Sequence, residues 1–75
     1  MPVLAVDQGT SGTKAVVVDG DGAVLALAEV PVTPRYLSDG RVEQDPMQLW
    51  DSVLAAGRQA VERAGVPIDA VGLAN

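Results

Sequence analysis

The feature that most constrains the fold of this chain is a polar, glycine-bearing turn between two short apolar runs. The turn covers residues 7–14, Asp-Gln-Gly-Thr-Ser-Gly-Thr-Lys, and the apolar runs cover residues 3–6 and 15–18. Both runs are rich in valine and lack helical spacing, so each predicts a β-strand. Such apolar runs are typical of strands buried on both faces. The sequence therefore predicts a hairpin held firmly within a sheet.

The turn carries groups that can bind a polyphosphate. Glycines within it allow backbone angles closed to other residues and let main-chain N–H groups approach an anion. Lys14 adds a positive charge, and Asp7 adds a carboxylate that can hold a hydrated magnesium ion. We predict a metal contact at Asp7. The predicted phosphate contacts are Gly9, Thr10, Ser11, Gly12, Thr13 and Lys14.

A second interpretation of the turn stays open on composition alone. Glycine, serine, threonine and aspartate are also the commonest turn residues, so a solvated hairpin with an exposed Lys14 would use them too. The turn is not a Walker loop, because the Gly-Lys-Ser/Thr ending at a helix start is missing and a strand follows. It is not a dinucleotide fingerprint either.

A third strand is predicted over about residues 23–32. Asp-Gly-Asp-Gly at residues 19–22 signals a tight turn before it, so the first three strands form an antiparallel meander. Asp19 and Asp21 could suggest a calcium loop, but no glutamate follows at the closing position. Glu29 and Pro31 suit an outer strand. Residues 33–41 predict a loop, in which Tyr36 is expected to be a packing residue.

A helix is predicted over about residues 46–64. Asp45 can cap its amides, Pro46 suits its first position, and Gly65 can end it. We assign Glu43 and Asp45 to capping and dipole complementarity rather than to acid–base catalysis. The predicted apolar stripe consists of Trp50, Val53, Leu54, Gly57, Ala60, Val61 and Ala64. It places Trp50 in the core and Gly57 in close packing against the sheet.

The last element is an apolar run over residues 70–74, reached after the helix. This order predicts a crossover to a strand parallel to the first. The predicted architecture is an α/β fold with the order β-β-β-α-β.

Composition excludes several classes of function. The chain of 75 residues contains no cysteine and no histidine, which removes disulfides, thiolate chemistry and a His-dependent triad. Its net charge is −5, which argues against nucleic acid or an anionic membrane as a partner. The N-terminal residues show neither a signal peptide nor a membrane span, so a cytoplasmic location is expected.

The turn at residues 7–14 resembles the first phosphate motif of the sugar kinase, heat-shock chaperone and actin superfamily. It matches the pattern D-x-G-T-[ST]-x-[ST]-[KR] at every constrained position. Within that group the chain is most similar to the FGGY carbohydrate kinases, which include glycerol kinase and xylulokinase. The supporting segments are residues 19–22, the Val-Glu-Gln-Asp-Pro of residues 42–46 and the Val-Gly-Leu-Ala-Asn of residues 71–75.

The resemblance implies that residues 1–75 are a partial N-terminal kinase domain, the opening half of a ribonuclease H-like domain. Asp7 would hold Mg²⁺ through water, Thr10, Ser11 and Gly12 would line the ATP phosphates, and Lys14 would contact phosphate oxygens. The substrate would be a sugar or polyol, and a homo-oligomer is possible. No catalytic residue is expected in this segment, because the catalytic aspartate of the family lies beyond it. The isolated chain is therefore expected to be inactive.

Two alternatives accompany this expectation. One is a non-catalytic nucleotide-binding module of the same superfamily. The other is a chaperone-like or actin-like relative that shares the phosphate hairpin, against which residues 42–46 and 72–75 favour the carbohydrate kinases.

Overall fold

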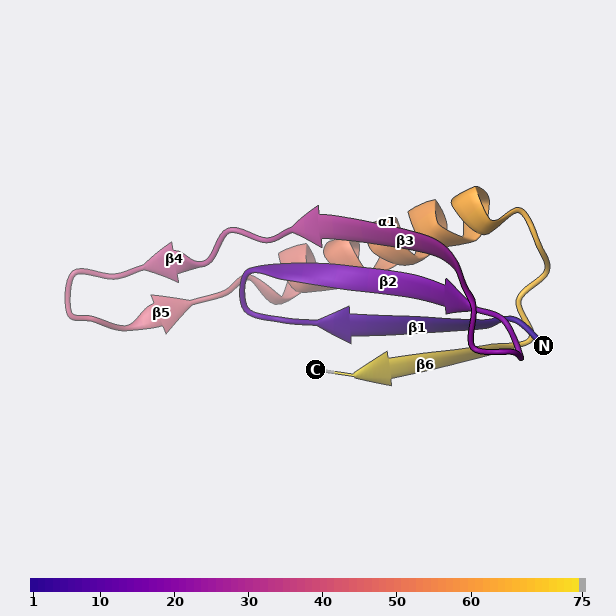
Figure 1. Ribbon diagram of the computed structural model, residues 1–75. Helices are drawn as coiled ribbons and strands as arrows, with labels where there is room; N and C mark the ends of the chain where they lie inside the picture. The colour runs from indigo at the N-terminus through magenta and orange to yellow at the C-terminus, as the bar shows by residue number, and fades with distance from the viewer. Residues whose placement is uncertain (75) are drawn as a thin grey trace.

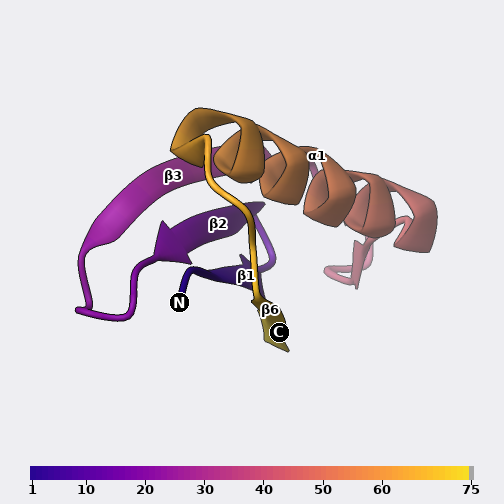
Figure 2. The same cartoon turned by 90° about the vertical axis from the view of Figure 1, so that its right-hand side faces the viewer.

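The computed structural model describes residues 1–74, which form a four-stranded mixed sheet with one helix on one of its faces (Figures 1 and 2). Asn75, the last residue of the predicted family segment 71–75, lies outside the described residues. The sheet has the strand order β3-β2-β1-β6. Its strands are β1 (Val3–Gln8), β2 (Gly12–Val18), β3 (Val24–Pro31) and β6 (Ala70–Ala74). The helix is α1 (Pro46–Ala64).

The strand pairing confirms the predicted meander and crossover. β1 and β2 run antiparallel with Val3 opposite Val18, and β2 and β3 are also antiparallel, with an irregularity between Val17 and Val18. β6 lies beside β1 and runs parallel to it, with Val3 opposite Ala70. The connection through α1 therefore brings the last strand against the first.

The predicted loop at residues 33–41 contains a small second sheet. β4 (Arg35–Tyr36) pairs with β5 (Val42–Glu43), and the two form an arm, residues 33–45, that projects beyond the main sheet (Figure 1). The prediction that Tyr36 packs against the protein is wrong, because this residue is 74% exposed on the arm. The arm extends past the elements that could cover it.

The core lies on one face of the sheet only. It consists of Leu4, Val6, Ala15, Val17, Ala26, Ala28, Ala56 and Ala60. Ala5, between Leu4 and Val6, is exposed, because successive side chains of a strand point to opposite faces. The prediction that the first two strands are buried on both faces is therefore wrong for the described chain, in which α1 covers a single face (Figure 2).

The buried face of α1 is made of small residues, namely Ser52, Ala56, Gly57 and Ala60. Small side chains let the helix axis approach the sheet closely, so the larger residues fall at the margins of the contact. Trp50 is 51% exposed, and the prediction that it belongs to the core is therefore wrong. Leu54 is exposed as well.

Asp45 and Gly65 cap the two ends of α1 as the sequence predicts, whereas the prediction that Glu43 also caps the helix is wrong, because this residue lies in β5. The Asp45 carboxylate accepts a hydrogen bond of 2.9 Å from the Met47 amide, and Pro46 occupies the first turn, where its missing N–H costs nothing. Gly65 follows with φ 65°, a left-handed conformation that favours glycine, and its N–H donates to the Val61 carbonyl. These caps fix where the helix begins and ends.

Replacing Gly57 with alanine is expected to stabilise the protein by about 0.5–1 kcal/mol, because alanine has the higher helix propensity. A Cβ atom at this position would lie 3.6 Å from Leu4 Cδ2, which is an ordinary contact. Urea unfolding followed by circular dichroism measures the change. The matched control is Gly65→Ala, which should destabilise because of the positive φ at this position. Loss of stability in Gly57→Ala would mean that the helix cannot accommodate even a methyl group here.

Two further features of the described residues bear on partners. The outer strand β3 carries an exposed Glu29 and ends at Pro31, which has no N–H to offer a neighbouring strand. Among residues 1–74, no helix has the length and apolar character needed to cross a membrane.

Candidate phosphate-binding site

The predicted phosphate turn forms the connection between β1 and β2. Its tip consists of residues 9–11, and its legs are the cross-strand pairs Asp7–Lys14 and Gln8–Thr13. The Gly9 amide donates to the Gly12 carbonyl at 2.8 Å and closes the turn. The tip lies at the end of the sheet from which the arm projects (Figure 1).

Three consecutive carbonyl oxygens of the tip accept hydrogen bonds from within the protein. Gly9 accepts from the Gln8 side-chain amide at 3.2 Å, Thr10 from the Gln44 side-chain amide at 2.7 Å, and Ser11 from the Val32 backbone N–H at 3.0 Å. All peptide bonds here are trans, so the N–H group of each of these peptide units points away from its carbonyl. The tip is therefore held by its carbonyl side.

The amide side of the tip remains free to bind a ligand. Within residues 1–74, the N–H groups of Thr10 and Ser11 have no hydrogen-bond partner in the protein. Consecutive backbone N–H groups at a turn make a concavity that attracts anions. The same tip carries the exposed hydroxyl groups of Thr10 and Ser11. This arrangement suits phosphate oxygens.

Gly12 lets β3 approach the hairpin closely. A Cβ atom at this position would lie 3.1 Å from the Val30 carbonyl oxygen, closer than most real contacts. The glycine is therefore needed for packing between β2 and β3, as well as for access to the backbone. This second role is not apparent from the motif.

Asp7 and Lys14 face each other across β1 and β2 on the sheet face opposite α1. Both side chains are exposed, and Glu29 lies on the other side of Lys14 on β3. Lys14 forms no ion pair with either acid among the described residues, so its ammonium group is available to an anion. The three charges form a row, with the positive charge between the two negative ones.

Thr13 lies on the opposite face from these charged groups. Its side chain is 0% exposed, and its hydroxyl is 2.7 Å from the Ser52 hydroxyl of α1. Ser52 in turn donates to the Leu49 carbonyl at 2.6 Å. The prediction that the Thr13 side chain contacts phosphate is therefore wrong, because that side chain connects the hairpin to the helix.

Removing the buried hydroxyl of Thr13 should affect stability rather than phosphate binding. We expect Thr13→Val to lower the free energy of unfolding by about 1 kcal/mol, since valine has a similar shape but cannot bond to Ser52. Urea unfolding of Thr13→Val, Ser52→Ala and the double variant gives the coupling energy of the pair. A coupling near zero would mean that the two hydroxyls do not stabilise each other.

Two residues of this site were missed by the sequence reasoning. Ser52 is a polar residue within the helix face that contacts the sheet, and its position next to Val53 in the stripe could have indicated a buried partner. Gln44 bonds a residue 34 positions away, and no local pattern predicts such a contact.

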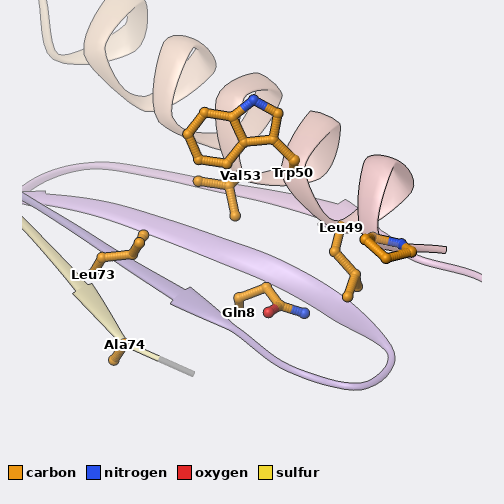
Figure 3. Close-up of a pocket in the computed structure, with 7 residues that line it drawn as sticks. Gln8, Leu49, Trp50, Val53, Leu73 and Ala74 are labelled. Atoms are coloured by element: carbon orange, nitrogen blue, oxygen red, sulfur yellow. The ribbon is translucent and has the colours of Figure 1, made fainter. Parts of the chain in front are cut away.

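An apolar pocket of about 340 Å³ lies beside the base of the hairpin. Figure 3 shows Leu49 and Val53 reaching from α1 toward Gln8 on β1 and Leu73 on β6, with the Trp50 ring beside the helix. Gln8 supplies the only polar side chain among the residues that line it. This pocket has the wrong chemistry for phosphate, which the polar tip of the hairpin suits instead.

Magnesium fits the hairpin through Asp7 alone. Among the described residues no three acidic side chains gather in a group that could hold a metal ion. Mg²⁺ commonly keeps several waters and takes one or two protein carboxylates together with substrate phosphates. A single exposed carboxylate beside the hairpin tip is compatible with that mode of binding.

This chain is similar to known proteins over nearly its whole length. Residues 2–75 match the family model described as the FGGY family of carbohydrate kinases, N-terminal domain. The glycerol kinases of Sinorhizobium fredii and Rhodospirillum centenum are 40% and 41% identical over alignments of 76 positions, which cover 97% of this chain. The chain spans only 15% of the length of either relative.

A solved structure shows the same fold. The ROK hexokinase from Thermus thermophilus superimposes with a TM-score of 0.74 at 26% sequence identity, covering 97% of this chain and 22% of that chain. This likeness confirms the predicted α/β fold as the opening half of the ribonuclease H-like domain of this superfamily.

Proposed function

Because the chain belongs to the FGGY family of carbohydrate kinases, we propose that it supplies one phosphate-binding wall of an ATP-dependent kinase acting on a sugar or polyol. The observation that carries the proposal is the hairpin tip, whose carbonyls are bound from within the protein while its amides stay free. Such a tip binds anions through the main chain. Lys14 and Asp7 supply the charge and the metal-binding carboxylate next to it.

The proposed mechanism is mainly one of positioning and electrostatics. Phosphoryl transfer spreads negative charge over the phosphate oxygens, and enzymes stabilise that charge with oriented donors and cations. Here the N–H groups of residues 10–12 would hold phosphate oxygens, and the Lys14 ammonium would offset their charge. Asp7 would hold Mg²⁺, which on binding would neutralise charge on the phosphates. The acceptor would be a hydroxyl of the sugar or polyol.

The proposal can be tested in a chimera. The matching segment of the Sinorhizobium fredii glycerol kinase would be replaced by this chain, and ATP-dependent phosphorylation of glycerol would be measured. We expect a folded chimera with activity above that of a chimera carrying Asp7→Ala. The 75-residue chain alone should show no turnover. A cooperatively folded chimera without ATP-dependent activity would contradict the proposal.

The alternative of a non-catalytic nucleotide-binding module predicts a different result. It requires the isolated chain to bind Mg-nucleotide, and it gives no reason for the chimera to be active. Isothermal titration of the chain with MgADP, beside the chimera assay, separates the two functions. A cytoplasmic location and a possible homo-oligomer stay predictions of the sequence.

A further inference from the structure

We propose that Gln44, outside the phosphate motif, is a positioning residue that sets the direction in which the hairpin presents the Ser11 N–H group to phosphate. The inference rests on the proposed function of the hairpin. It starts from one hydrogen bond, in which Gln44 Nε2 donates to the Thr10 carbonyl oxygen at 2.7 Å. Gln44 itself would not contact the ligand.

The physical link is the planarity of the peptide unit. The Thr10 carbonyl and the Ser11 N–H belong to the same peptide plane and, in a trans peptide, point in opposite directions. Fixing the oxygen therefore fixes the hydrogen. Without Gln44, rotation of this plane would turn the Ser11 N–H away from its present direction, because the Thr10 carbonyl has no other partner among the described residues.

Gln44 is well placed to act as a rigid support. It is half-buried and directly precedes Asp45, whose carboxylate caps α1 and whose carbonyl accepts a hydrogen bond from Leu49 at 3.1 Å. The start of the helix thus fixes the backbone of Gln44.

The other end of the arm supports the same tip. Val32, which follows the last residue of β3 and precedes the arm, donates its backbone N–H to the Ser11 carbonyl at 3.0 Å. Two neighbouring peptide planes of the tip are therefore oriented from the two ends of the arm, by Val32 just before it and by Gln44 within it. Of these two supports, Gln44 can be removed without changing the backbone, whereas removing the Val32 N–H would require proline.

The test compares Gln44→Met with Gln48→Met in the chimeric kinase. Methionine has a similar length to glutamine but cannot donate a hydrogen bond. Gln48 is an exposed residue of the same region, and its side chain forms no hydrogen bond within residues 1–74, so Gln48→Met is the matched control. We expect Gln44→Met to lower kcat/KM for ATP about tenfold and to leave KM for glycerol unchanged. For Gln48→Met we expect kcat/KM for ATP to stay within about twofold of the value for the parent chimera.

A second measurement reports on the peptide plane itself, independently of activity. In the ¹⁵N-labelled chain, Gln44→Met should shift the Ser11 amide resonance while the resonances of Ala15 and Val17 in the core stay unchanged. Gln48→Met should leave Ser11 unchanged.

The outcomes separate this inference from the proposed function. The parent chimera could be active while both methionine variants have the same kcat/KM for ATP as the parent and Gln44→Met leaves the Ser11 amide resonance in place. In that case the positioning role is wrong while the kinase function stands. If Gln44→Met changes the KM values for ATP and glycerol equally, Gln44 stabilises the fold generally and the inference is also wrong. An inactive, folded parent chimera would overturn the proposed function itself.

Discussion

Replacing Asp7 with alanine is expected to lower kcat of the chimeric kinase by about 100- to 1000-fold, the range seen when one preorganised charge-stabilising group is removed. Asp7 is the only acidic residue in the hairpin, residues 7–14, and no nearby group of acids could replace it as a metal ligand among the described residues. Without it, the hairpin would offer magnesium no carboxylate. Steady-state kinetics at saturating ATP and glycerol measure the effect.

The same substitution should leave the fold intact. Asp7 is exposed, and its side chain forms no hydrogen bond or ion pair within residues 1–74, so the free energy of unfolding should change by less than about 1 kcal/mol. Asp51→Ala, on the exposed side of α1, removes the same charge and should keep full activity. If Asp7→Ala retained near-parental kcat, the metal role proposed for Asp7 would be wrong.

Replacing Lys14 with methionine is expected to lower kcat/KM for ATP by about 100-fold. The Lys14 ammonium is the only positive charge in the hairpin, and it stands between the carboxylates of Asp7 and Glu29. Its removal would leave the two negative charges to repel the phosphates, with no positive charge in the hairpin to offset them. The effect should appear in both kcat and KM for ATP.

Two control variants make this prediction specific. Lys14→Arg keeps the charge and should retain most of the activity, although a planar guanidinium differs from a compact ammonium. Arg58→Met removes a positive charge from the exposed side of α1 and should have little effect. Equal activity of Lys14→Met and Arg58→Met would show that Lys14 does not contact phosphate.

Much of the fold could be predicted because its signals are local. The Asp45-Pro46 start and the Gly65 end define α1 at the residues observed, Pro46–Ala64, since capping depends on neighbouring residues. The meander followed from the short apolar runs and from the glycine-bearing turns between them. By contrast, the exposure of Trp50 depends on how closely the small residues of α1 approach the sheet, a tertiary property that helical spacing does not contain.

The candidate site was predictable in its position but only partly in its geometry. The motif located the hairpin and its two charges, because these residues are adjacent in sequence. It did not reveal that Thr13 turns inward to Ser52, since a strand alternates faces and only its register decides which hydroxyl is buried. Nor could it reveal Gln44 or Val32, which reach the tip through the tertiary fold.

The arm formed by β4 and β5 is expected to be less stable than the main sheet, and it adjoins the hairpin tip. A lone two-stranded ribbon is only marginally stable in water, and the four residues of these strands are all exposed. Opening of the arm should therefore require much less free energy than global unfolding, and its amides should exchange with solvent far sooner than those of β2. Val32 and Gln44 lie on either side of β4 and β5. Opening of these two strands would therefore leave intact the two hydrogen bonds that hold the tip. The turn proposed to bind phosphate thus lies between the arm, which we expect to open locally, and the four-stranded sheet, which we expect to open only with the whole fold.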